Sequence, residues 1–409
     1  MKKATLLLLC GALSFCACHK DPVPEVPAKD ADLTGEKVDV SFLPASVSKV
    51  FMLNEGQMGS NNATLDFLRM SDGNYITGAF RKMNPNVGAG LGDVGNDIAV
   101  HGDEVWLVVN NSGIVEVVSA EDETEIAVIA VPTPRNIAFD DRYAYVTSWA
   151  GAFTAGSYDE NWNWTLTDYR NPKGQVYRID LNTKKVDGTV EVGYQPEGIA
   201  YYAGKLYVAN SGGIASQLPP NYAYDNSVSI IDTKTFKVAK TLEFQINLKS
   251  VYADGKGNIY VTSLGNYWDI HSGLYAFSAY DLNTVWRIGG EGHHVTGSCQ
   301  LGDTIYCIGT TDEFDFSAAH TYKVWATCMN DNEPGKSTLT YYPLEITGTP
   351  YSMAVLENRD FSSAHYLLLG DAGDYFNPGT LSCYQLDHNE NTRLWSVDAG
   401  VCPGHFAVY

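Results

Sequence analysis

A two-strand pattern that returns along the whole chain is the feature that most limits its fold. In its clearest copy, Gln195 to Asn210 reads QPEGIAYYAGKLYVAN: a turn, a short apolar strand, a glycine turn and a second strand rich in Tyr and Val. Two such runs joined by a short turn are the signal of a β-hairpin. Comparable copies begin at residues 95, 134, 248, 296 and 350. One hairpin repeated in this way indicates a repeat architecture.

The last copy is incomplete, and this decides how the repeats are joined. The chain ends in PGHFAVY from Pro403, which corresponds to the first strand of the hairpin alone. KVFMLNEG from Lys49 corresponds to a second strand without a first. Pairing the two would close a ring and leave no open sheet edge. Seven positions are then equivalent, 39 to 62 residues apart: Ile98, Ile137, Ile199, Val251, Ser298, Met353 and Phe406. This spacing is typical of propeller blades, so we predict an all-β, seven-bladed β-propeller over residues 48–409.

Composition and charge narrow the classes of partner. Hydrophobic residues make up 44% of the chain and charged residues 18%, which is typical of a globular protein. The formal net charge is −21, and it becomes −23 once the first 17 residues are removed. Such an acidic protein repels polyanions, so we expect no nucleic-acid partner and no binding to an anionic membrane surface.

The N-terminus predicts export and lipid attachment. Two lysines precede an apolar run that is too short to span a membrane and that ends in cysteines, as in a secretory signal. Cys18, followed by charged residues, resembles the acceptor of Bacteroidetes lipoproteins sent to the cell surface; Cys16 is the alternative. We expect residues 1–17 to be a lipoprotein signal peptide and residues 18–47 a flexible tether. The protein would then lie on the outer membrane at the cell surface, touching the bilayer through its lipid only.

Five long loops follow the second strands of the repeats and are rich in aromatic residues. Because strands within a blade are antiparallel, these loops and the inter-blade turns must share one face of the ring, here called the loop face. Aromatic rings beside amides and carboxylates suit a bulky, flat or ring-shaped ligand with polar edges. The candidate ligand-binding residues are Trp149, Trp162, Trp164, Tyr222, Tyr224, Tyr267, Trp268, Phe314, Phe316, Tyr375 and Phe376.

Motifs for catalysis or for a cofactor are scarce. GLGDVG at residues 90–95 matches a dinucleotide fingerprint, but a strand follows it where a helix is needed. PGKST from Pro334 lacks the first glycine of a phosphate-binding loop, since Asn330 stands there. His293 and His294 are either structural or able to bind a metal or a metal-containing ligand. We expect a protein that is not an enzyme and has no catalytic residues, metal site or cofactor.

Five cysteines remain beyond the signal: Cys299, Cys307, Cys328, Cys383 and Cys402. The odd number leaves at least one of them unpaired within the chain. Cys299 and Cys307 flank one predicted hairpin and could face each other. The alternative is that these residues serve as small apolar side chains on strands.

Three stretches carry a family resemblance: NEGQMGSNNATL from Asn54, LGDVGNDIAVHGDEVWLVVNNS from Leu91, and the terminal PGHFAVY. They resemble the YncE-like surface-lipoprotein β-propellers of Bacteroidetes, and among these the cobalamin-capturing proteins of the outer-membrane cobalamin transporter. The resemblance implies capture of cobalamin or a related corrinoid, as ligand and not cofactor, for a TonB-dependent transporter. Two alternatives are a surface glycan-binding protein, since Trp and Tyr also stack on sugars, and a propeller lyase or hydrolase.

Overall fold

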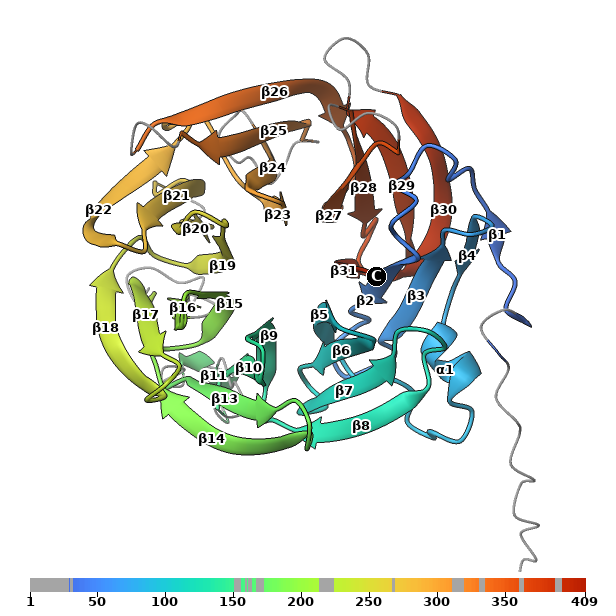
Figure 1. The fold of residues 1–409 in the computed structure, drawn as a ribbon, viewed down its shortest axis with the longest axis horizontal. Coiled ribbons are helices and arrows are strands. Elements are labelled where there is room, and N and C mark those ends of the chain that lie inside the picture. Colours follow the sequence, from blue (N-terminus) through green and yellow to red (C-terminus); the bar gives the residue numbers. More distant parts are fainter. Residues whose placement is uncertain are drawn as a thin grey trace, which may run out of the picture.

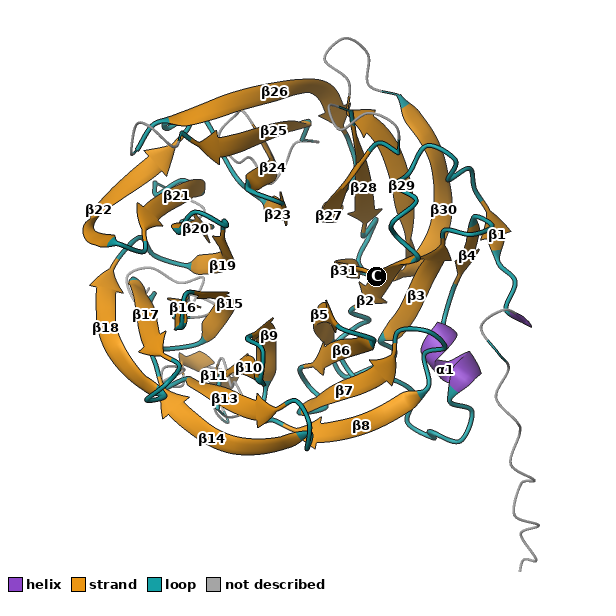
Figure 2. Ribbon diagram, viewed as in Figure 1, coloured by secondary structure: helices purple, strands orange, loops and turns teal. Residues whose placement is uncertain are grey.

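Seven β-sheets stand around a common axis in the computed structural model, like the blades of a propeller (Figure 1). The only helix among the described residues is one short turn-like segment, α1 (Ala79–Met83), so strands and loops dominate Figure 2. The structure describes residues 29, 32–150, 156–158, 160, 164–166, 173–212, 224–266, 269–310, 320–330, 335–359, 364–386 and 392–409. The predicted fold class, an all-β seven-bladed propeller, is confirmed.

The blades follow one another along the chain, each with four antiparallel strands ordered from the axis outward. Blade 1 contains β31 (Pro403–Val408), β2 (Lys49–Asn54), β3 (Thr64–Arg69) and β4 (Asn74–Ile76), with β1 (Glu36–Lys37) added at its edge. Blade 2 contains β5 (Gly95–His101), β6 (Glu104–Val109), β7 (Ile114–Ser119) and β8 (Glu125–Ala130). Blade 3 contains β9 (Pro134–Phe139), β10 (Tyr143–Ser148), β13 (Gln175–Asp180) and β14 (Lys185–Glu191). Blade 4 contains β15 (Pro196–Tyr202), β16 (Lys205–Asn210), β17 (Ser227–Asp232) and β18 (Lys237–Glu243).

The remaining blades keep the same order. Blade 5 contains β19 (Leu248–Ala253), β20 (Asn258–Ser263), β21 (Gly273–Ser278) and β22 (Asp281–Ile288). Blade 6 contains β23 (Gly297–Leu301), β24 (Thr304–Thr310), β25 (Tyr322–Met329) and β26 (Ser337–Ile346). Blade 7 contains β27 (Pro350–Glu357), β28 (His365–Asp371), β29 (Pro378–Leu386) and β30 (Arg393–Val401). A small separate hairpin, β11 (Gly156–Tyr158) with β12 (Trp164–Leu166), lies in the loop after β10.

The seven equivalent positions of the repeat occupy equivalent places in the structure. Each lies on an inner strand and pairs with the middle of the next strand, as Ile137 does with Val146 and Ile199 with Val208. The long loops begin beside the inter-blade turns: the amide of Trp149 bonds to the carbonyl of Thr133 at 3.2 Å. The described ends of these loops therefore lie on the face where the inner strands begin, as predicted.

The core consists of seven buried clusters, one between each pair of neighbouring blades. Strand β6 shows why the repeat is so apolar. Its Leu107 packs toward blade 1, whereas the next-door Trp106 packs toward blade 3, and both side chains are fully buried. Because successive side chains of a strand point to opposite faces, a blade in the ring must be apolar on both of them.

Ring closure is made by the pairing that the split repeat predicts. β31 runs antiparallel to β2, with Met52 opposite Phe406. The fully buried carboxylate of Asp66 strengthens the junction: it accepts hydrogen bonds from the Asn54 amide at 2.8 Å and the Gly400 backbone amide at 3.3 Å. Asp66 thus joins blade 1 to the end of β30 in blade 7.

The part of the N-terminal segment nearest the ring packs against the blades. Residues 38–48, here called the N-terminal strap, cross blades 1 and 7 on the face opposite the loop face. Leu43 is buried, and the ring of Phe42 lies 4.5 Å from that of Tyr366. Val38, Val40 and Phe42 alternate with Asp39 and Ser41, and this apolar side packs against the core between blades 1 and 7. Within the described part of the chain, no helix is both long and apolar enough to cross a membrane.

Candidate binding site at the channel mouth

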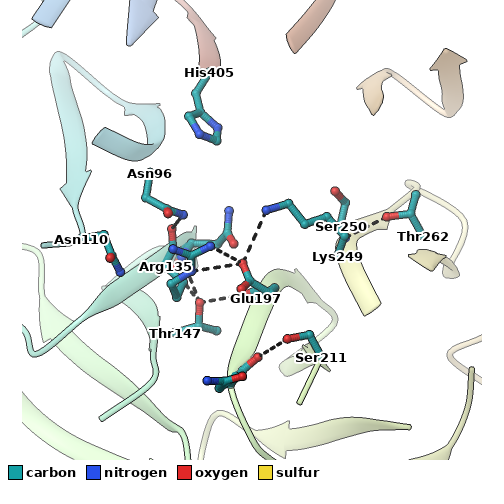
Figure 3. A network of polar contacts seen from close by, with 12 residues as sticks. Asn96, Asn110, Arg135, Thr147, Glu197, Ser211, Lys249, Ser250, Thr262 and His405 are labelled. Carbon is teal, nitrogen blue, oxygen red and sulfur yellow. Dashed lines mark hydrogen bonds and ion pairs between the residues drawn. The ribbon is translucent and has the colours of Figure 1, made fainter. Parts of the chain in front are cut away.

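The seven inner strands surround a channel of about 980 Å³ along the axis of the ring. Its wall includes all seven equivalent positions of the repeat, most of which carry apolar side chains. Polar groups gather instead at the loop-face end, where each inner strand begins just after an inter-blade turn. On the opposite face, Pro44, Ser46 and Val47 of the N-terminal strap reach the wall. The channel wall therefore mixes apolar side chains with polar ones such as Ser298 and Gln300, and charged groups lie at its loop-face mouth (Figure 3).

Three charged residues on consecutive inner strands meet on one side of this mouth (Figure 3). Arg135 on β9 donates to one carboxylate oxygen of Glu197 on β15, from Nη2 at 2.9 Å and from Nε at 3.2 Å. Lys249 on β19 approaches the same oxygen to 3.7 Å. The Arg135 guanidinium also lies 4.5 Å from the centre of the Trp149 ring, a favourable cation–π contact. Blades 3, 4 and 5 are thus joined by one chain of charges.

Backbone contacts hold these residues in position. The side-chain amide of Asn96 donates to the carbonyl of Arg135 at 2.8 Å, and the hydroxyl of Thr147 donates to the carbonyl of Glu197 at 2.8 Å (Figure 3). Both donors come from the blade that precedes the residue they support. The geometry of the mouth is therefore set by contacts between blades rather than within one of them.

On the other side of the mouth, the carboxylate of Glu55 receives two hydrogen bonds. His405 Nε2 lies 3.1 Å from one oxygen, and the hydroxyl of Tyr351 donates to the other at 2.7 Å. Burial favours the neutral acid, but His405, Tyr351 and the charge of Lys249 outweigh it and lower the pKa of Glu55. Burial, together with the neighbouring carboxylate, raises the pKa of Tyr351. Glu55 is therefore held as a paired anion.

Asp97 is a further carboxyl group in the channel wall. Its two oxygens accept the backbone amides of Ile98 and Ile137, each at 2.9 Å, so it links the inner strands of blades 2 and 3. Burial raises the pKa of Asp97 in spite of these bonds and of the nearby His405. Asp97 therefore has a structural task, which is to link the two strands through their backbone amides.

An exposed apolar surface adjoins the rim at blades 1 and 7. Met58, Tyr375 and Phe376, here called the aromatic shoulder, have 75%, 49% and 74% of their surface exposed. Gln57 joins the two loops, since its side-chain amide lies 3.4 Å from the carbonyl oxygens of Tyr375 and Phe376. The ring of Tyr375 meets that of Tyr351 edge-on at 5.8 Å, so the shoulder continues directly into the polar rim.

The loop that carries the shoulder is internally hydrogen-bonded. The carboxylate of Asp374 accepts the backbone amides of Phe376 at 2.9 Å and Asn377 at 2.8 Å. That of Asp371 accepts the amides of Gly373 and Thr349. Tyr375 is held at φ 66°, a conformation that residues with a side chain seldom adopt. The exposed rings are therefore presented on a preorganised loop.

The predicted aromatic residues fall into four groups. Tyr375 and Phe376 are exposed beside the mouth, as a binding role requires. Trp149 supports Arg135, and Tyr224 is partly buried, so these two are at least partly packing residues. Trp164 lies in β12, for which only the backbone pairing with β11 is described. The others lie outside the described residues: Trp162, Tyr222, Tyr267, Trp268, Phe314 and Phe316.

The charged rim was not anticipated from the sequence, although a signal for it exists. Polar residues follow the first position of successive inner strands, as in PRN from Pro134, PEG from Pro196 and LKS from Leu248. Alignment of the seven copies would have placed Arg135, Glu197 and Lys249 in one layer. Which of them pair, and that Glu55 joins His405 across the closure, depends on the ring.

His293 and the cysteines show structural roles. His293 hydrogen-bonds to the hydroxyl of Tyr341 and packs edge-on against Trp325, and burial lowers the pKa of His293. Within the described ranges, no group of three or more His, Cys, Asp or Glu residues could hold a metal ion. All five cysteines are free thiols, and burial raises the pKa of Cys299 to about 12.

Comparison with known proteins supports the fold alone. No protein-family model and no curated protein matches the chain. Among solved structures, hydrazine synthase of Kuenenia stuttgartiensis is 16% identical, covering 76% of this chain and 88% of its own, with a TM-score of 0.53. A 6-phosphogluconolactonase candidate from Bacteroides fragilis is 12% identical, covering 89% and 99%, with a TM-score of 0.54. Another from Bacteroides uniformis is 11% identical, covering 88% and 100%, also with a TM-score of 0.54. The chain therefore shares a propeller fold with these proteins.

Proposed function

We propose that this protein binds a bulky, polar-edged ligand on its loop face and passes it on without transforming it. The observation that carries this proposal is the aromatic shoulder, exposed on a preorganised loop and continuous with the polar rim. Exposed apolar groups gathered in this way favour an interaction site over a merely solvated surface. The carboxylate of Glu55 is already hydrogen-bonded, and Glu197 is paired with Arg135, so both favour holding a ligand over proton transfer.

The ligand proposed is cobalamin or a related corrinoid. A corrinoid has broad apolar faces and a fringe of amides. Its faces match the rings of Tyr375 and Phe376, and its amides match the donors and acceptors of the rim. The sequence resemblance to the cobalamin-capturing surface propellers points in the same direction. Capture for a TonB-dependent transporter, by a protein attached to the outer membrane through a lipid on Cys18, completes the proposal.

Calorimetric titration of the purified protein with cyanocobalamin tests this proposal. We expect one-to-one binding and a rise in melting temperature, because a ligand that binds only the folded state stabilises it. Phe376→Ala should weaken the binding at least several-fold while leaving the melting temperature of the free protein nearly unchanged. If the wild-type protein shows no binding heat and no shift in melting temperature, corrinoid capture is excluded.

Glycan binding is the second candidate, because the same shoulder has the exposed, rigid rings on which sugars stack. Electrophoresis through gels that contain polysaccharide distinguishes the two. The glycan would be favoured over the corrinoid if a polysaccharide retards the wild-type protein, Phe376→Ala abolishes this retardation, and cyanocobalamin gives no response.

A further inference from the structure

Lys249 acts on the two rim carboxylates only from a distance, because each of them has a closer partner. Arg135 is engaged twice, by the Glu197 carboxylate at 2.9 Å and by the Trp149 ring. Glu55 is satisfied by His405 and Tyr351. Each of the two carboxylates thus has a close partner without any contribution from Lys249.

Lys249 is held much more loosely than its neighbours. Its Nζ lies 3.7 Å from Glu197, which is too long for a hydrogen bond. Its side chain is 44% exposed, whereas those of Arg135 and Glu197 are 13% and 6% exposed. Lys249 lines the channel, and Figure 3 shows its amino group extending from β19 toward Glu197. The ammonium group is therefore available at the point where the channel opens.

We propose that Lys249 binds an anionic oxygen of the ligand at the channel mouth, from a phosphodiester or a carboxylate group. This inference rests on the proposed function, because the anionic oxygen would belong to a ligand seated on the aromatic shoulder. An ammonium group is a point charge that suits such oxygens without a fixed angle. Arg135 offsets the charge of Glu197, and the oxygens of Glu55 are already hydrogen-bonded to Tyr351 and His405, so neither carboxylate is bare toward the anion.

The chain contains a matched control for this lysine. Lys256 lies in the turn at the other end of the same hairpin of blade 5, with its side chain 41% exposed and 3.4 Å from Asp303. It is therefore as exposed as Lys249 but lies on the opposite face of the ring. Lys249→Gln and Lys256→Gln remove the same charge from the same blade, so only position differs between them.

Two corrinoids test the inference within the proposed function: cyanocobalamin, which contains a phosphodiester, and dicyanocobinamide, which lacks it. We expect Lys249→Gln to weaken cyanocobalamin about tenfold, as one charge-assisted hydrogen bond allows, and to leave dicyanocobinamide unchanged. Lys249→Arg should retain the discrimination, and Lys256→Gln should affect neither ligand. Equal loss for both corrinoids, or no loss for cyanocobalamin, would overturn the phosphodiester assignment.

A second measurement does not depend on corrinoids. After reductive ¹³C-methylation of the lysines, the Lys249 methyl resonance, assigned by its absence from Lys249→Gln, is followed during titration with inorganic phosphate and with acetate. We expect the Lys249 resonance to move while that of Lys256 does not. The anion that moves it at the lower concentration indicates whether the subsite prefers a phosphate or a carboxylate. No movement with either anion would overturn the anionic subsite even if cyanocobalamin binds. Movement without any corrinoid binding would retain the subsite and reject the proposed ligand.

Discussion

Individual buried charges are stabilised to very different degrees in this protein. Lys49 and Glu123 form an ion pair at 2.6 Å with almost no exposure, and the Lys49 ammonium also lies 4.7 Å from the centre of the Phe67 ring. Glu116 on β7 is 2% exposed, yet one of its oxygens is buried without a hydrogen-bond partner. Burial, with the neighbouring Glu125, raises the pKa of Glu116 to about 8. This carboxyl group is therefore expected to be protonated in the neutral range.

Glu116 should make stability depend on pH in a direction opposite to that of most carboxyl groups. Its pKa in the folded state, about 8, is above the ordinary value of 4.5, so the folded protein binds the extra proton between these values. The contribution of Glu116 to the free energy of unfolding is then greatest below pH 4.5. It falls as the pH rises from 4.5 to about 8, by up to about 1.4 kcal/mol per pH unit. Urea unfolding at several pH values should show this fall, and Glu116→Gln should remove it. A fall of equal slope in the variant would assign the effect to another group.

At the scale of elements, the loop between β28 and β29 shows how a short segment can present a surface. Asp374 organises it by accepting consecutive backbone amides, as aspartate does in tight turns. The turn on the opposite face between β17 and β18 uses the same device, where Asp232 accepts the amide and the hydroxyl of Thr235. The two turns differ in what they expose, since only the first carries an aromatic ring beside the channel.

Asp374→Ala should therefore loosen the aromatic shoulder without unfolding the ring. We expect faster hydrogen exchange at the amides of Phe376 and Asn377, and cyanocobalamin binding weaker by about threefold to tenfold because the loop must be ordered on binding. The free energy of unfolding should change by less than about 1 kcal/mol, as is usual for surface positions. Asp232→Ala is the control: amide exchange in its own turn should become faster to a similar extent, and cyanocobalamin binding should be unchanged. Unchanged exchange at Phe376 would show that Asp374 does not organise the loop.

The molecule as a whole is held together by its closure. Seven buried interfaces follow one another around the axis, so each blade is packed on both faces only while the ring stays closed. β2 is buried along its whole length because β31 covers its inner edge. The mouth also depends on closure, since Glu55 follows β2 and His405 lies in β31, at opposite ends of the sequence.

Removal of residues 403–409 should abolish the soluble monomer, because the inner edge of β2 would then present unpaired amides and carbonyls to other chains. Size-exclusion chromatography should show aggregates, and thermal unfolding should lose its single cooperative transition. His405→Ala keeps the strand and should remain monomeric, which separates the backbone from the side chain. A monomeric truncated protein with a sharp transition would show that closure is not required.

The sequence by itself determined the ring, the number of blades and the closing strand. These follow from a repeated apolar pattern, which records that every blade is buried on both faces, and from a repeat cut at one place. Exposed aromatic residues at Tyr375 and Phe376 were also predictable, because loops follow the second strands. Only the tertiary structure decided that Glu197 pairs with Arg135 while Lys249 stays at 3.7 Å, and that Glu55 meets His405. The packing of the N-terminal strap rests on an alternation of only five residues, 38–42, which does not show by itself what the strap packs against. Pairing across blades depends on side-chain geometry between segments about 50 to 350 residues apart, and no local pattern encodes such distances.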